Sequence, residues 1–234
     1  MHNEIDNVLK LEKQTLEPYT AAYKTAGQAA TIENGWPIPV ILAHDPSAET
    51  AAIIAKWPKL SDRENVIDYH EWTKREMQPD YIKLMHESGR MMGRKLEQPS
   101  VELQRIVVEE SRAHGYLTVA HALSLQDTLD VLEAGIDGLT HTICDQPPAQ
   151  DLVDAYKKNN AWLNPTLAAV GSLTTEGKDL QHQYAHDPRV AGLIDEAKIG
   201  NLCACMAFAA EHGKVDYASE SVKALRKAGI KILW

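Results

Sequence analysis

Apolar runs and amphipathic stretches alternate along most of this chain. From residue 81 onward, short runs rich in Ile, Leu, Val and Ala are followed by longer stretches whose apolar residues recur every three or four positions. The short runs have the length of buried strands, and the longer stretches have the period of helices packed on one face. Regular alternation of strand and helix is typical of a parallel sheet covered by helices. The pattern therefore predicts an α/β fold.

The predicted elements follow one another with short connections. We expect strands at residues 36–43, 81–85, 117–121, 136–141, 162–167 and 230–234, and helices at 47–55, 63–75, 101–114, 125–134, 149–159, 190–211 and 219–228. The first 34 residues are also expected to be helical, because Asn34-Gly35 is a typical helix end. We therefore predict one domain in two parts, an N-terminal helical segment at 1–35 and the α/β unit at 36–234.

Two architectures fit such a pattern, an open doubly wound sheet and a closed barrel. No GxGxxG motif follows any predicted strand, so the dinucleotide-binding form of the open sheet has no support. Periodicity alone does not separate the two architectures. The polar residues at the strand ends carry more information.

Composition excludes several classes of function. The formal net charge of −9 argues against nucleic acid as the main partner, because phosphate binding needs a basic surface. No apolar window is long enough for a transmembrane helix, and the N-terminus has no apolar signal core, so we expect a cytoplasmic protein with no membrane contact. Three cysteines are too few, and odd in number, for a disulfide framework.

Three consecutive predicted strands carry a residue that binds metals where an apolar residue would be usual. Lys83 lies inside YIKLM, His121 ends LTVAH, and His141 ends IDGLTH. The two histidines are 20 residues apart, about one strand–helix unit, so both lie at the same end of a parallel sheet. Barrel enzymes place their chemistry at the carboxyl ends of their strands.

The chemistry of these three residues suits a divalent metal. Burial of an unpaired ammonium is costly, so the pKa of Lys83 is expected to fall and leave a neutral amine. Such an amine adds carbon dioxide to give a carbamate, an anionic oxygen ligand. Two neutral imidazoles and a carbamate make a plausible zinc site. The alternative is that each histidine is a hydrogen-bonded structural residue, which a lone strand-end histidine more often is.

Other polar residues are expected to face the same pocket. His86 and Glu87 follow Lys83 and are candidates for proton transfer, and four residues at or beyond strand ends are candidates for substrate contact: His44, Asp45, Asn164 and Thr166. The remaining histidines are expected at the surface, and Cys203 and Cys205 are expected to be small buried residues of a helix.

The segment from Asp80 to His141 resembles the amidohydrolase superfamily, especially its imidazolonepropionase-like and prolidase-like branch. The matching stretches are DYIKLMHESG, VELQRIVVEESRAHG, TVAHALSLQDTLDVLEAGIDGLTH, NPTL and ALRKAGIKILW. The resemblance implies a (β/α)₈ barrel in which the strand-four lysine is carboxylated and bridges two metals, and the histidines ending strands five and six bind the second metal. Lys83, His121 and His141 match those positions one by one.

The chain also departs from the family pattern. No His-x-His occurs anywhere, and the chain stops at Trp234, where the family places a Gly-Thr-Asp motif with a metal-binding aspartate. Six strands are predicted where the family has eight. We therefore expect a partial or modified (β/α)₈ TIM-type barrel of about six parallel strands, with at most one divalent metal per chain, most simply zinc.

The resemblance implies a hydrolase that cleaves an amide, cyclic amide or ester bond of a small molecule. The missing motifs keep an alternative open, a non-hydrolytic barrel acting as a lyase, isomerase or cyclase, or as a small-molecule-binding pocket protein. We also expect a homodimer, because an incomplete barrel would have unpaired edges at residues 36–43 and 230–234.

Overall fold

One parallel sheet lies at the centre of the molecule. The computed structural model describes residues 26–190, 192–193 and 195–233. The four strands of the sheet are β1 (Tyr81–Met85), β2 (Leu117–His121), β3 (Gly138–Thr140) and β4 (Trp162–Asn164). Their order in the sheet is their order in the chain. An order without reversal is that of strands wound in one direction, as in a barrel, and not that of a doubly wound sheet.

A short bridging segment extends the sheet on each side. On the β1 side, the Ala30 N–H donates to the Lys83 carbonyl at 2.7 Å, and the Ala30 carbonyl accepts from the Met85 N–H at 2.9 Å. On the β4 side, Ile232 pairs in parallel with Leu163. The terminal apolar run at 230–233 thus joins the sheet as predicted, although only as a bridge. Among the described residues these segments form an arc, and a closed barrel is not observed.

A helix follows each strand, and four of the described helices begin at a side-chain cap. Ser47, Asp62, Ser100 and Ser124 each accept a hydrogen bond from the backbone N–H three residues on, which satisfies an amide that the first helical turn leaves without a partner. The helices are α2 (Ile38–His44), α3 (Ala48–Ala55), α4 (Arg63–Glu76), η2 (Arg90–Met92), α5 (Val101–Ala113), α6 (Leu125–Glu133), α7 (Gln150–Asn159), α8 (Leu167–Thr174), α9 (Lys178–Ala185), η3 (Pro188–Val190), α10 (Glu196–Cys203) and α11 (Val215–Lys227). Within the described part of the chain, none is long and apolar enough to cross a membrane.

The predicted first strand is wrong. Residues 38–44 form helix α2, and of these only Ile38 is buried. A short apolar run fits either element, and proline is favoured in the first turn of a helix. Pro37 and Pro39 therefore indicated a helix start, not a strand start. As a result, the expected unpaired edge at 36–43 does not exist.

The predicted N-terminal helix is also wrong where it can be checked. Residues 1–25 lie outside the described residues, and residues 26–35 contain turns and isolated bridges instead of helix. Ala30 and Thr31 are buried and pair with residues of the α/β unit. The proposed division at residue 35 remains a prediction.

The helical prediction at 190–211 was too long. The region forms α10, which ends at Cys203, and it packs against α9, which the sequence analysis did not predict. Residues 204–214 are not helical. Their backbone is held by Ser172 of α8, whose Oγ donates to the Ala204 carbonyl at 3.3 Å and accepts from the Met206 N–H at 3.2 Å.

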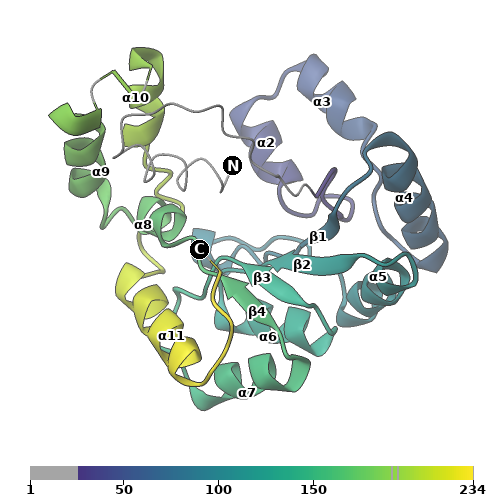
Figure 1. Ribbon diagram of the computed structural model, residues 1–234. Helices are drawn as coiled ribbons and strands as arrows, with labels where there is room; N and C mark the ends of the chain where they lie inside the picture. Colours follow the sequence, from purple (N-terminus) through teal and green to yellow (C-terminus); the bar gives the residue numbers. More distant parts are fainter. Residues whose placement is uncertain (1–25, 191, 194, 234) are drawn as a thin grey trace, which may run out of the picture.

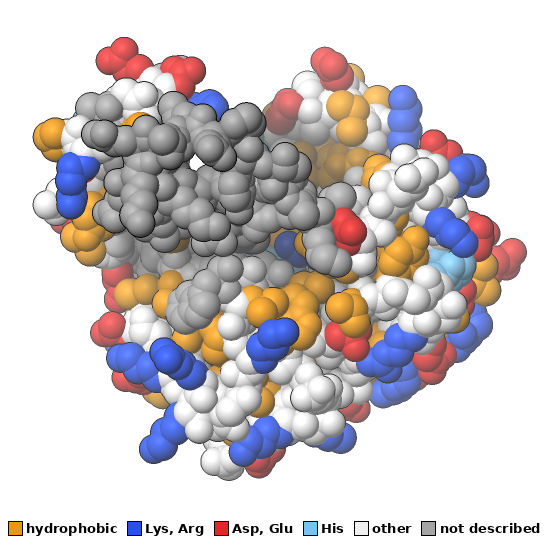
Figure 2. Space-filling view, in the orientation of Figure 1, with side chains coloured by type: hydrophobic (Ala, Val, Ile, Leu, Met, Phe, Trp, Pro, Cys, Tyr) orange, Lys and Arg blue, Asp and Glu red, His pale blue; other side chains and the backbone are white. Residues whose placement is uncertain are grey.

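The helices separate into two groups around the sheet (Figure 1). Helices α5, α6, α7 and α11 lie along one side of it, while α2–α3 and α8–α10 stand apart from each other beyond its other side. The main core lies between the sheet and the first group and includes Leu84, Ala120, Leu139, Leu163 and Leu225, all fully buried. On the face drawn in Figure 2, Lys, Arg, Asp and Glu are interspersed over the outer helices, and hydrophobic side chains gather nearer the middle.

A close approach fixes the pairing of β3 with β4. Gly138 lies opposite Trp162 in the parallel register. A Cβ atom at position 138 would lie 2.1 Å from the Trp162 ring, nearer than any side chain tolerates. Only glycine therefore fits beneath this indole.

Candidate active site at the carboxyl ends of the strands

Of the three predicted metal-binding residues, the two histidines lie at the carboxyl end of the sheet and Lys83 lies inside β1. Lys83 is the third residue of β1, His121 is the last residue of β2, and His141 follows the last residue of β3. In the register of the sheet, His121 lies opposite Thr140, the residue before His141. The two histidines are thus neighbours at the strand ends, and the metal-binding role of all three residues stays a prediction.

His121 is the centre of the arrangement. It is 5% exposed, and its ring stacks on Trp36 with centroids 5.5 Å apart. The ring of His141 meets it edge-on, with centroids 4.8 Å apart. Nε2 of His121 lies 3.2 Å from Oε2 of Glu87, and this glutamate is itself buried.

Burial sets the charge states of this group. It is the main cause that lowers the pKa of His121 to about 3, and the nearby Lys83 contributes to the same shift. Burial also lowers the pKa of Lys83, and it raises the pKa of Glu87 to about 7, with the Asp127 carboxylate adding to the rise. His121 and Glu87 therefore form a hydrogen bond and not an ion pair, because burial disfavours the charged form of each.

His141 lies immediately after β3. Its backbone φ is 77°, a conformation that a non-glycine residue rarely adopts and that is often found at functional sites. Its N–H donates to the Asn164 carbonyl at 2.9 Å, and its Nδ1 lies 2.5 Å from the Thr166 hydroxyl. Asn164 and Thr166, predicted as substrate contacts, are thus brought next to His141, where both bond to it.

His86 does not join this group. Along β1 and its continuation, Lys83, Met85 and Glu87 alternate with Leu84 and His86, so the two sets point to opposite sides. The His86 ring lies on the helix side, where its Nε2 is 3.0 Å from the Gln98 amide and 3.6 Å from an Asp130 oxygen, and its Nδ1 is 3.2 Å from the Gln104 amide. Alternation alone would have separated it from Glu87.

His44 and Asp45 are exposed and lie at the end of α2. The Asp45 carboxylate accepts from the Ser47 N–H at 3.1 Å and from the Thr50 hydroxyl at 2.5 Å, and these bonds lower its pKa. It thus closes the turn before α3. The expectation that a strand would deliver both residues to the pocket fails because that strand is a helix.

A cavity of about 100 Å³ opens beside the two histidines. Its walls are largely apolar and are formed by Trp36, Met91, Met92, His121, Leu123, His141, Ala169, Leu173, Met206, Phe208 and Ala209. The sequence analysis missed Trp36, Met206 and Phe208 as lining residues. Their position depends on how residues 26–37 and 204–209 cross the strand ends, which no local pattern reveals.

Lys83, His121 and His141 match a metal site in chemistry more than in spacing. His121 and His141 offer imidazole nitrogens, and Lys83 would offer a carbamate oxygen, which are donors that a zinc-type ion accepts. Among the described residues, the ligand atoms of the two histidines are not gathered with a third His, Cys, Asp or Glu ligand atom as closely as a bound ion requires. In the described part of the chain, groups of three His, Cys, Asp or Glu ligand atoms within 4.8 Å of one another occur at His182, His186 and Cys203 and at His86, Asp127 and Asp130. Neither group includes His121 or His141, so this pair fits a metal by chemistry more than by distance.

Comparisons with known proteins agree on the fold. The chain is similar to phenylurea hydrolase B, with 17% identity over 92% of this chain and 45% of that chain and a TM-score of 0.59. It is similar to a Xaa-Pro dipeptidase with bound methionine, with 15% identity over 88% of this chain and 45% of that chain and a TM-score of 0.54. It is also similar to A. niger ochratoxinase, with 18% identity over 88% of this chain and 44% of that chain and a TM-score of 0.53. These are structures of the amidohydrolase superfamily. The chain thus spans under half the length of each protein and shares the fold of that part, as the sequence resemblance predicts.

No protein-family model and no curated protein sequence matches the chain.

Proposed function

We propose that this chain forms an amidohydrolase-type hydrolytic site that cleaves an amide, cyclic amide or ester bond of a small molecule. The observation that carries the proposal is the meeting of His121, His141 and Glu87 beside a cavity at the carboxyl ends of parallel strands. Barrel enzymes place their chemistry at this end. Hydrolases among the similar structures support the same reaction class.

Lys83, His121 and His141 are the residues that would hold a divalent metal, most simply one zinc ion per chain. A divalent ion would polarise water and a substrate carbonyl, as such ions do in hydrolases. Lys83 would contribute as a carbamate. Burial lowers its pKa, which supports this assignment, because only a neutral amine has the lone pair that attacks carbon dioxide. The uptake forms an N–C bond and releases one proton from nitrogen.

Glu87 is our candidate for moving a proton during cleavage. Its carboxyl is buried and lies 3.2 Å from Nε2 of His121, which lines the cavity. A carboxyl at this place would accept a proton from water and deliver it to the leaving group. His86 is better suited to positioning, because its contacts with Gln98 and Gln104 hold the chain on which Glu87 lies.

The cavity walls suggest the kind of substrate. Trp36, Phe208 and several Met, Leu and Ala side chains form most of the surface, and His121 and His141 provide its polar part. Such a lining favours a substrate with an apolar substituent next to the scissile carbonyl. Thr166, bonded to His141, is more remote from it.

The same lining favours a second candidate, a non-hydrolytic pocket that binds or rearranges an apolar small molecule. Turnover in ¹⁸O-labelled water separates the two. Hydrolysis places label in the product acid. Product formed without label would reject the hydrolase, and chelation that leaves turnover intact would remove the metal from the mechanism.

We also propose a homodimer, now on different grounds. The edge expected at 36–43 is absent, but α9, α10 and their connection expose Leu180, Tyr184, Leu193 and Leu202. Neighbouring exposed apolar residues favour association. Light scattering at high concentration tests this, and a stable monomer would reject it.

A further inference from the structure

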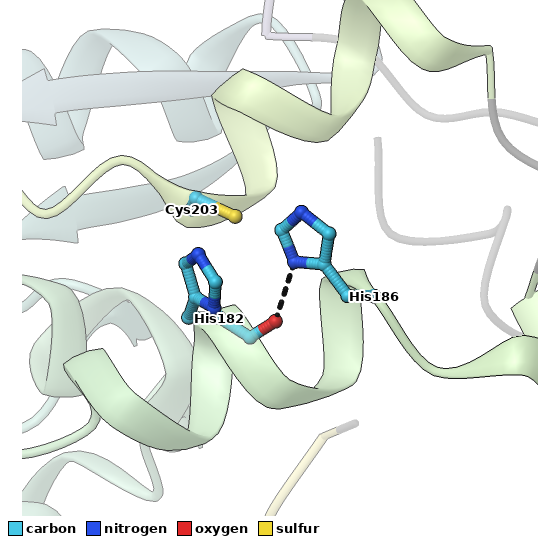
Figure 3. A group of neighbouring side chains, drawn as sticks. All are labelled: His182, His186 and Cys203. Carbon is cyan, nitrogen blue, oxygen red and sulfur yellow. Dashed lines mark hydrogen bonds between the residues drawn. The ribbon is translucent and has the colours of Figure 1, made fainter.

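A second group of metal-binding side chains lies outside the candidate active site, where α9 packs against α10. His182 and His186 come from α9 and its last turn, and Cys203 is the last residue of α10. Their ligand atoms all lie within 4.8 Å of one another. In Figure 3 both rings and the sulfur point toward one shared space between the helices.

Helical geometry accounts for the histidine pair. Residues four apart lie on the same face of a helix, about one turn from each other. The rings accordingly stack, with centroids 4.3 Å apart and planes inclined by 27°. The His-x-x-x-His spacing was therefore visible in the sequence, but the third donor was not.

A hydrogen bond prepares His186 for an ion. Its Nδ1 lies 2.8 Å from the His182 carbonyl, and this contact requires Nδ1 to carry the proton. In the neutral ring Nε2 then has the lone pair. Metal-bound histidines commonly donate their other ring N–H to a carbonyl in this way.

Cys203 is held over the pair by a separate contact. The Gln181 side-chain amide donates to the Leu202 carbonyl at 3.2 Å and to the Ala204 carbonyl at 3.4 Å, on either side of Cys203. These bonds tie the end of α10 to α9. Cys203 is a free, half-buried cysteine, so its sulfur is available as a thiolate ligand.

We propose that His182, His186 and Cys203 form a zinc-binding site that fastens α10 to α9. Two imidazole nitrogens and one thiolate are donors that zinc prefers, and the partial exposure of the group leaves a fourth position for water. Copper accepts the same donors; we commit to zinc, for which two imidazoles, one thiolate and a water complete a four-coordinate site. The proposal does not depend on the hydrolase proposal, because none of its residues lies at the strand ends.

Cobalt titration of the full chain tests the site. Co²⁺ replaces Zn²⁺ in tetrahedral sites and gives a charge-transfer absorption in the near ultraviolet when a thiolate is bound. The background is His121→Ala, which removes the candidate active-site metal. We expect one Co²⁺ per chain with this absorption, displaced by Zn²⁺. Cys203→Ser should abolish the absorption, and His182→Ala should weaken Co²⁺ binding at least tenfold.

Cys205→Ser is the matched control, because Cys205 lies two residues away and contacts Gln181 instead. Cys144 is a second control, because burial raises the pKa of its thiol to about 12. Cys205→Ser and Cys144→Ser should both keep the absorption. Absorption that survives Cys203→Ser, or that disappears in Cys205→Ser, would overturn the proposal, as would a His121→Ala protein that binds no Co²⁺. Circular dichroism verifies that each variant is folded.

Discussion

Two pairs of histidines in this protein differ in almost every physical respect. His121 and His141 come from different strands, and His121 is almost fully buried; His182 and His186 lie one turn apart on a helix and are exposed. The buried pair depends on the packing of the whole sheet, whereas the exposed pair depends on one helical turn and one neighbouring helix. Convergence is tighter in the exposed pair, which joins a third ligand atom within 4.8 Å.

The difference separates two uses of a metal-binding residue. A surface site formed by local geometry suits an ion that stabilises structure, because little else surrounds it. A buried site next to a cavity suits chemistry, because desolvation shifts pKa values, as it does for His121, Lys83 and Glu87. If this distinction is right, changes to the two sites should affect different measurements.

The largest expected effect is loss of hydrolysis at the buried pair. His121→Ala or His141→Ala should bring turnover of an amide or ester substrate to the uncatalysed rate, because each removes a proposed metal ligand. His182→Ala, at the exposed pair, should retain turnover. Elemental analysis should find one metal fewer per chain in each of the three variants. Turnover that persists in both strand-end variants would contradict the proposed function.

The next effect separates Glu87 from His86. Glu87→Gln should lower kcat/KM by roughly 10²-fold, the usual cost of losing general acid–base catalysis. His86→Asn should act mainly on stability, by about 1–3 kcal/mol, since it leaves buried partners without hydrogen bonds. Steady-state kinetics and urea unfolding measure the two effects. If His86→Asn gave the larger kinetic loss in a stably folded protein, the assignments would have to be exchanged.

A smaller effect is expected at the exposed site. Zinc at about 100 times its Kd should stabilise the region by roughly 2.7 kcal/mol, which corresponds to about 100-fold fewer open molecules. Tryptic cleavage at Arg189 and Lys198, which are exposed and lie between His186 and Cys203, should slow accordingly. Cys203→Ser should remove this protection, and Cys205→Ser should retain it. Equal protection in both variants would mean that zinc acts elsewhere.

The smallest effect concerns His70, a buried histidine that belongs to neither pair. Its Nδ1–H donates to the Val66 carbonyl at 2.7 Å, and its Nε2 lies 2.8 Å from the Ser111 hydroxyl. Burial lowers its pKa below 6.5, so the unfolded chain binds a proton more readily than the folded one. This contribution to stability is complete above pH 6.5 and is lost as the pH falls toward the folded pKa.

We therefore expect wild type to lose more stability than His70→Gln as the pH falls below 6.5. Chemical unfolding at a series of pH values measures the difference. Parallel curves for the two proteins would show that His70 does not titrate differently on folding.

The sequence predicted β1 and β2 correctly because its local signals agree there, whereas the strands predicted at 136–141 and 162–167 are shorter in the structure. The bounds predicted for the strands at 81–85 and 117–121 are those observed, and Lys83 and His121 were located correctly within them. The apolar runs are short and isolated, and each is followed by a capped amphipathic helix. Local preference and burial therefore point to the same structure.

Prediction failed where tertiary contacts determine the secondary structure or the position of a side chain. Residues 38–44 are apolar enough for a buried strand but form a half-exposed helix, and 26–35 join the sheet through bridges that no periodicity indicates. Cys203 reaches the histidine pair only because Gln181 holds the end of α10. His86 is a different case, since strand alternation already separated it from Glu87 and the pattern was not applied beyond Met85.

The contact between Gly138 and Trp162 limits how the sequences of related proteins can change at these two positions. Because the indole of Trp162 occupies the space of a Cβ at position 138, Gly138 cannot be replaced while Trp162 is present. A larger residue at 138 requires a smaller one at 162, so the change at 162 has to come first. Among homologous sequences these two positions should therefore co-vary, and their pairing marks the alignment of β3 with β4 even where overall identity has faded.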